Sequence, residues 1–145
     1  MKWIHGLSLF IATVMLAGCA AMGGNTVQLK MTGAEEVPPV TTSASGTGSV
    51  TVGADGAVGG TFTTQGAVIL AAHIHDGAAG ANGPVIIPLQ KTGENDWAVP
   101  AGAKLTEAQM QSYKAGRLYV NFHTAKFKGG EIRGQIRPGS GGGGY

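Results

Sequence analysis

The chain has 145 residues, enough for one ordinary domain, and its single Cys excludes an intramolecular disulfide. Ten Lys and Arg residues against eight Asp and Glu residues leave a formal charge of +2, which excludes a nucleic-acid binder that relies on phosphate neutralisation. The 26 Gly residues in a chain that is 43% hydrophobic indicate a folded domain with many tight turns, built from short strands rather than long helices.

The N-terminal segment has the features of a secretion signal. Met1 and Lys2 form a short positive region, residues 7–17 form an apolar run, and small residues lead into Cys19. This arrangement resembles a bacterial lipoprotein signal, which is cleaved before a Cys that is then acylated. We therefore expect residues 1–18 to be the signal peptide and Cys19 to be the lipid anchor. An ordinary signal peptide with an incidental Cys, or an N-terminal membrane helix, is the alternative.

A lipid anchor implies a location at a membrane. Several acyl chains on one residue exceed what stable membrane attachment requires. In lipoproteins of bacteria with two membranes, the residue after the acylated Cys helps to sort the protein, and Ala20 favours the outer membrane. We expect a cell-envelope protein that contacts the membrane through its N-terminal lipid. Its protein partners and its oligomeric state stay open.

The folded unit is predicted to span residues 27–138. Residues 19–26 combine the lipidated Cys with small and polar residues, and we expect them to form a flexible spacer. Residues 139–145 are mostly Gly and cannot bury apolar area, so we expect a disordered tail.

Within this unit, apolar and polar residues alternate as in strands with one buried face. The alternating segments are residues 27–32, 50–52, 118–123 and 132–136. The turn signals between strands are Asp55-Gly56, Gly59-Gly60, residues 77–83 and Gly129-Gly130. Short strands with glycine-rich turns predict an all-β fold, an antiparallel Greek-key sandwich or barrel.

One short helix is predicted near residue 106. Thr106, with Gln109 three positions later, forms the pattern of a capping box. Gly116 is expected to end the helix. Met110 and Tyr113 are interpreted as packing residues, because apolar side chains at that spacing usually face a core.

Three histidines remain after the predicted signal peptide. His73 and His75 alternate along a predicted strand, so their imidazoles share one face about 6.6 Å apart, while Ile74 points into the core. His123 ends another predicted strand, on the face opposite its core residues. If the two strands are neighbours, three imidazoles gather on the outside of the sheet.

Such a cluster suits a transition metal. Neutral imidazoles bind copper and zinc, and three nitrogen ligands leave a position open for water or another donor. Asp76 and Glu131 are candidates for that position or for contacts that orient the rings. Because ligand imidazoles must be neutral, metal affinity is expected to fall below about pH 6.5. The alternative is that the histidines are polar strand-end residues hydrogen-bonded to loops.

Other chemistries find little support in the sequence. No Ser, Thr or Cys lies in a recognisable nucleophile motif. Glu35 and Glu36 are adjacent, so in a strand they face opposite ways and do not form a convergent acid–base pair. The glycine-rich residues 80–84 precede no helix pattern, and we interpret them as a tight loop beside the histidine pair rather than a phosphate site.

Six segments of the folded unit form an ordered set of motifs. They are residues 36–40, 71–75, 82–85, 105–106, 116–124 and 130–136. This set resembles the CHRD domain, a family named from chordin and found in many bacterial secreted proteins. The resemblance implies an extracytoplasmic β domain, without a generally established activity in microbial members. Asp76-Gly77 stands where the family commonly has Gly-Pro, which places an additional carboxylate near the histidine pair.

The histidine pattern also has a weaker likeness to the copper ligands of copper–zinc superoxide dismutases, which carry metal on the outside of a Greek-key barrel. The likeness implies that His73, His75 and His123 are ligands. It leaves the expected architecture as superoxide-dismutase-like or immunoglobulin-like. No fourth histidine is left after signal cleavage to complete a dismutase copper site, and no further cluster supplies a zinc site, so dismutation is not expected.

Three functions are compatible with this pattern. The leading one is a lipid-anchored, non-enzymatic CHRD-type module that binds a transition metal, with copper as first choice and zinc as second. The second is a protein-interaction or matrix module, as in chordin, in which the histidines are structural. The third is a dismutase-like redox enzyme, which requires a further metal ligand.

Overall fold

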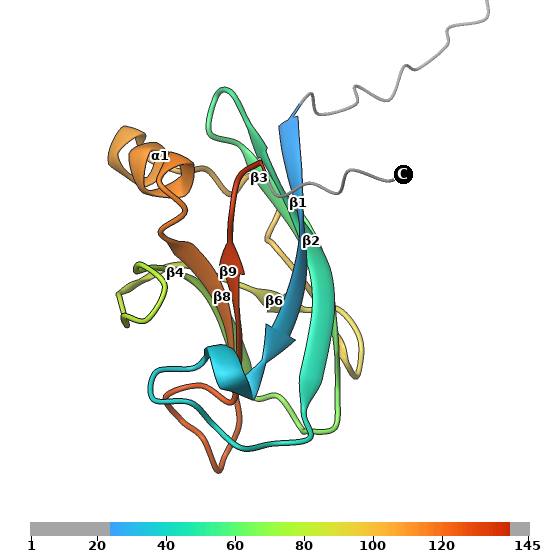
Figure 1. Cartoon of the computed structure of the whole chain (residues 1–145). Coiled ribbons are helices and arrows are strands. Elements are labelled where there is room, and N and C mark those ends of the chain that lie inside the picture. The colour runs from blue at the N-terminus through green and yellow to red at the C-terminus, as the bar shows by residue number, and fades with distance from the viewer. Residues whose placement is uncertain (1–23, 140–145) are drawn as a thin grey trace, which may run out of the picture.

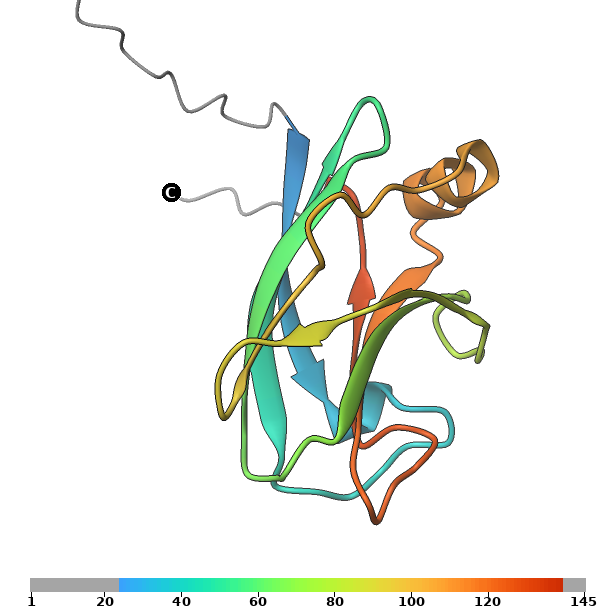
Figure 2. The same ribbon diagram turned by 180° about the vertical axis from the view of Figure 1, so that it is seen from behind.

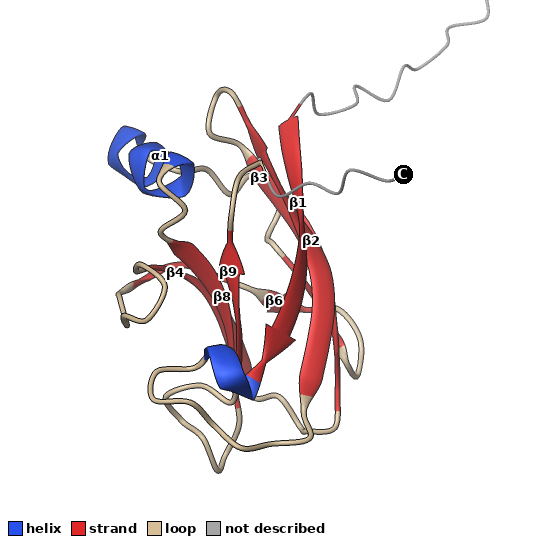
Figure 3. Ribbon diagram, viewed as in Figure 1, coloured by secondary structure: helices blue, strands red, loops and turns tan. Residues whose placement is uncertain are grey.

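The computed structural model of the chain describes residues 24–139, and it is nearly all β (Figures 1 and 3). The strands are β1 (Gly24–Thr32), β2 (Ser45–Gly53), β3 (Val58–Gln65), β4 (Ala71–Asp76), β5 (Val85–Pro88), β6 (Gln90–Lys91), β7 (Asp96–Ala98), β8 (Leu118–His123) and β9 (Ile132–Ile136). A short 3-10 helix, η1 (Gly33–Glu35), follows β1, and the helix α1 (Glu107–Lys114) precedes β8. The predicted signal peptide, Cys19 and residues 140–145 of the predicted tail lie outside the described residues.

The strands form one antiparallel sheet in the order β5-β4-β8-β9-β1-β2-β3-β7-β6. Figures 1 and 2 show this sheet curling into a nearly closed barrel. Closure follows because Leu89 alone separates β5, which pairs with β4, from β6, which pairs with β7. β9 returns to lie beside β1, the first strand of the β1–β2–β3 meander, and this is a Greek-key order. The predicted all-β, antiparallel fold is confirmed.

Alternate residues of the strands fill the barrel interior, as the apolar periodicity predicts. Fully buried examples are Val27, Met31, Val50, Phe62, Ile74, Leu118, Val120, Phe122, Ile132 and Ile136. The Phe122 ring lies edge-on to Phe62 and Trp97, with ring centroids 5.9 and 6.3 Å apart. Phe122 precedes His123 in β8, so this packing also fixes the strand that carries the third histidine.

The start of the sheet differs from the predicted boundary at Val27. Gly24, Asn25 and Thr26 already belong to β1, where they pair with residues 51–53 of β2. The hydroxyl groups of Thr26 and Thr51 lie 2.8 Å apart and share a hydrogen bond. The last three residues of the predicted spacer are therefore part of the strand, because backbone pairing extends a strand past the point where its apolar pattern ends.

The predicted turn at Gly59-Gly60 is wrong, since both residues lie inside β3. A Cβ atom at Gly60 would lie 2.5 Å from the carbonyl oxygen of Ser49 in the neighbouring strand. The Gly60 carbonyl accepts a hydrogen bond from the Val99 amide at 3.0 Å. The close approach of neighbouring backbone, rather than a turn, explains this glycine.

The predicted capping box of α1 is confirmed. Thr106 Oγ1 accepts a hydrogen bond from the Gln109 amide at 3.2 Å, and Gln109 Oε1 accepts one from the Thr106 amide at 2.9 Å. Gly116, just past the helix, has a φ of +69°. Tyr113 is buried in the core and Met110 packs against it, as predicted. Within residues 24–139, no helix has the length and apolar character needed to cross a membrane.

Candidate metal centre

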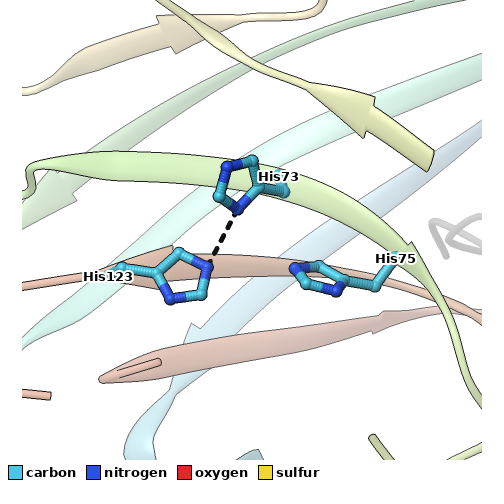
Figure 4. Close-up of side chains that lie close together, drawn as sticks. All are labelled: His73, His75 and His123. Atoms are coloured by element: carbon cyan, nitrogen blue, oxygen red, sulfur yellow. Dashed lines mark hydrogen bonds between the residues drawn. The ribbon is translucent and has the colours of Figure 1, made fainter. Parts of the chain in front are cut away.

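The two strands that carry the histidines are neighbours in the sheet. β4 and β8 are antiparallel, with Ala71 opposite His123, His73 opposite Asn121 and His75 opposite Tyr119. These side chains share the outer face of the barrel, whereas Ile74 and Phe122 point into the core. The condition for a three-histidine cluster is therefore met, and Figure 4 shows the three imidazoles facing one another.

The ring nitrogens of the cluster are close enough to share one ion. His73 Nδ1 lies 3.0 Å from His123 Nε2, the contact dashed in Figure 4. One ligand nitrogen from each of the three histidines lies within 4.8 Å of the other two. Nitrogens bound to one metal at about 2 Å lie about 3 to 4 Å apart. Small rotations of the side chains would bring the set to that spacing.

Backbone carbonyls set the tautomers of two of the rings. His75 Nδ1 donates to the carbonyl oxygen of Gly83 at 2.9 Å, and His123 Nδ1 donates to that of Lys128 at 2.9 Å. A carbonyl only accepts, so both Nδ1 atoms carry the proton and both Nε2 atoms present a lone pair to the cluster. His73 Nδ1 then donates to His123 Nε2. A metal at His73 Nδ1 would displace that proton, which the ring can hold on Nε2 instead.

Burial keeps the three imidazoles neutral. It lowers the pKa of His73, His75 and His123 below the usual 6.5, and in each ring it is the largest cause. The neighbouring histidines lower the pKa of His73 further. The hydrogen bonds to carbonyl groups oppose the shift in His75 and His123 without reversing it. All three rings are thus ready to act as ligands at neutral pH.

An aromatic stack supports His75. The Tyr119 ring is nearly parallel to it, with an interplanar angle of 10° and ring centroids 4.8 Å apart. The Arg133 guanidinium lies over the same Tyr119 ring, with Cζ 3.5 Å from the centroid. β4 and β9 flank β8 on opposite sides, so Tyr119 lies between His75 and Arg133. This stack fixes the plane of the His75 ring.

The loop between β4 and β5 is tied down over this face. Arg133 donates to the carbonyl oxygens of Ala78 and Ala81, both at 3.0 Å. Gln135 Nε2 donates to the carbonyl oxygen of Gly77 at 3.0 Å. Gly83 must be a glycine, because a Cβ there would collide with the carbonyl oxygen of Asp76. The predicted tight loop beside the histidine pair thus carries the carbonyl that orients one ligand ring.

Most of the chain matches one known domain family. The family model of the CHRD domain matches residues 27–136, which include β4, β8 and β9. The chain belongs to the CHRD family. No curated protein and no solved structure matches it. The ordered motifs noted in the sequence are therefore confirmed as those of a CHRD domain.

The two carboxylates predicted near the histidines contact other side chains of this CHRD domain. Asp76 Oδ2 accepts a hydrogen bond from Ser112 Oγ at 2.7 Å, and Asp76 Oδ1 lies 3.8 Å from Nε of Arg117. Glu131 accepts hydrogen bonds from the hydroxyl groups of Thr42 and Thr124, at 2.5 and 2.6 Å. The cluster of possible ligands found in residues 24–139 joins the three histidines without either carboxylate.

The sequence did not reveal the residues that support the CHRD histidines. The strands β8 and β9 were predicted to expose one face, but Tyr119, Asn121, Arg133 and Gln135 on that face are all buried. The loops that follow β4 and β8 contact them, through residues 77–83 and Gly129. The only available signal was the row of large polar residues in two strands, and that row is also typical of a solvated face.

Glu36 is a further residue whose burial only the structure of this CHRD domain shows. Its side chain is 4% exposed, and Oε1 finds no hydrogen-bond partner among the described residues. Burial raises the pKa of Glu36 to about 7, against the opposing charge of Arg133. Glu35 is exposed at the end of η1, whereas Glu36 is buried. The two carboxylates therefore do not converge, as predicted.

Proposed function

We propose that this CHRD domain is a non-enzymatic module that binds one transition metal ion through His73, His75 and His123, with copper as the first choice and zinc as the second. The donor set supports the proposal, since neutral imidazole nitrogens suit both metals. The spacing of those nitrogens, within 4.8 Å of one another, also supports it.

The observation that carries the proposal is the second nitrogen of His75. Nε2 is buried, faces the cluster, and has no hydrogen-bond partner among the described residues. A buried polar atom without a partner costs about 1 to 3 kcal/mol. A histidine with a purely structural role would satisfy both ring nitrogens. A metal ion bound by the cluster would give Nε2 its partner.

A titration of the purified domain with Cu(I), Cu(II) and Zn(II) tests the proposal. His73→Ala removes one of three ligands, so we expect its affinity for the preferred metal to fall at least about 100-fold relative to wild type. Thr47→Ala is the matched control, because Thr47 is exposed on β2, which β9 and β1 separate from β8. Equal, weak binding by wild type and His73→Ala would contradict the proposal.

We further propose that acylated Cys19 holds the module at the cell envelope, with the outer membrane as its site. The lipoprotein-like signal and the extracytoplasmic character expected of a CHRD domain support this location. Cys19→Ser is expected to move the protein from the membrane fraction to the soluble fraction of cells. A mass measurement of the wild-type N-terminus is the direct check, and an unmodified Cys19 would overturn this part of the proposal.

The alternative function is a protein-interaction module whose histidines are structural. It predicts that His73→Ala lowers the free energy of unfolding while every metal affinity stays unchanged. The same variant therefore separates the two functions, with chemical denaturation and metal titration as the two measurements.

A further inference from the structure

Arg133 is a buried cation that forms no ion pair with any carboxylate among residues 24–139. Its side chain is 1% exposed. Its guanidinium donates to the carbonyl oxygens of Ala78 and Ala81 and to Oε1 of Gln135, which are all neutral acceptors. Burying a charge without an oppositely charged partner costs folding free energy. Hydrogen bonds to carbonyl groups do not neutralise the charge of the Arg133 guanidinium.

The charge of Arg133 lies close to the proposed metal site, because Arg133 and His75 both contact the Tyr119 ring. The guanidinium lies 3.5 Å from the Tyr119 ring centroid, and the His75 ring lies 4.8 Å from it on the other side. The Tyr119 hydroxyl accepts from the Gly83 amide at 3.1 Å and donates to the Gly83 carbonyl, so it is engaged with the loop rather than free to bind metal. Protein rather than water fills the space between cation and ligand, so the charge is weakly screened.

The nearby carboxylates do not cancel this charge at the histidines. Glu36 and Glu35 act on Arg133, but the pKa of Glu36 is raised to about 7, so near neutral pH it is only partly ionised. The carboxylates of Glu131 and Asp76 contact other side chains, Glu131 those of two threonines and Asp76 those of Ser112 and Arg117. Arg133 is the permanently charged group that acts on His75, and it lowers the pKa of that ring. Through the stack on Tyr119, the charge of Arg133 therefore acts on the cluster at His75.

We propose that Arg133 makes the three-histidine site selective for a monovalent ion, so that it binds Cu(I) in preference to Zn(II) and Cu(II). This inference rests on the proposed metal-binding function. Three neutral imidazoles bring no negative charge to offset the ion, and a fixed cation repels a divalent ion twice as strongly as a monovalent one. At a separation on the order of 10 Å and an effective dielectric constant of about 20, one unit of ionic charge corresponds to a factor on the order of ten in affinity.

The test compares Cu(I) with Zn(II), because zinc is divalent and does not change its oxidation state during the titration. Cu(I) affinity is measured without oxygen by competition with a coloured Cu(I) chelator, and Zn(II) affinity by competition with a zinc indicator. Wild type is compared with Arg133→Gln, which removes the charge, and with Arg133→Lys, which keeps it. We expect Arg133→Gln to gain about tenfold in Zn(II) affinity relative to Cu(I), and Arg133→Lys to keep the wild-type ratio.

Circular dichroism of each variant establishes first that it is folded. A ratio that is the same in wild type and in folded Arg133→Gln would overturn the inference. If Arg133→Gln does not fold, the ratio of Cu(I) affinity to Zn(II) affinity in wild type is the test. Tighter binding of Cu(I) than of Zn(II) supports the inference. Tighter binding of Zn(II) overturns it. Wild type that binds neither metal would instead overturn the proposed function itself, so the two failures are distinguishable.

Discussion

Saturating copper is expected to raise the free energy of unfolding of the protein by about 4 kcal/mol when the free ion is a thousand times its dissociation constant. A ligand that binds only the folded state stabilises that state by mass action. The site exists only in the folded chain, because β4 and β8 bring together histidines that are distant in sequence. Urea denaturation with and without the ion, under conditions that keep its oxidation state fixed, is the measurement.

The same denaturation of His75→Ala is the control for this prediction. Its folded state loses the nitrogen that lacks a partner, and with it one of three ligands, so the ion should add little to its stability at the same concentration. An equal gain in wild type and in His75→Ala would mean that the ion binds elsewhere. A gain in neither protein would contradict a metal-binding function.

Glu36→Gln is expected to raise the free energy of unfolding by about 2 to 3 kcal/mol above pH 7, relative to its effect near pH 4.5. Burial raises the pKa of the Glu36 carboxyl from 4.5 to about 7 in the folded protein. Between these values the folded protein keeps a proton that the unfolded chain has lost. Wild type therefore loses stability as the pH rises through this window, and the loss is complete above pH 7. Gln does not titrate and avoids the loss.

Urea denaturation at several pH values between 4.5 and 8 measures this difference. Glu35→Gln is the matched control, since Glu35 is exposed and the same change there should leave the pH dependence of stability as in wild type. The histidines titrate in both proteins, so only the difference between variant and wild type is informative. Parallel curves for wild type and Glu36→Gln would show that Glu36 ionises in the folded protein as it does in the unfolded chain.

Local sequence patterns were sufficient to predict several strands, the helix and the shared face of two histidines. The alternation at residues 118–123 and 132–136 predicted β8 and β9, and the Thr106 and Gln109 pair predicted the start of α1. The spacing of His73 and His75 placed both rings on one face of one strand, since successive side chains of a strand alternate between faces. These features depend on residues that are close along the chain, and so they are readable from the sequence.

Contacts between distant segments were decided by the tertiary structure. Which strand lies beside β4 depends on the path of the whole barrel, and it is β8 that brings His123 to the other two histidines. The covering loops turned an expected solvent face into a buried one, and that burial explains the lowered pKa values of the histidines, the raised pKa of Glu36 and the unpaired charge of Arg133. Burial is a property of the complete fold, because it depends on every segment that excludes water from a site, and a local pattern of residues does not contain it.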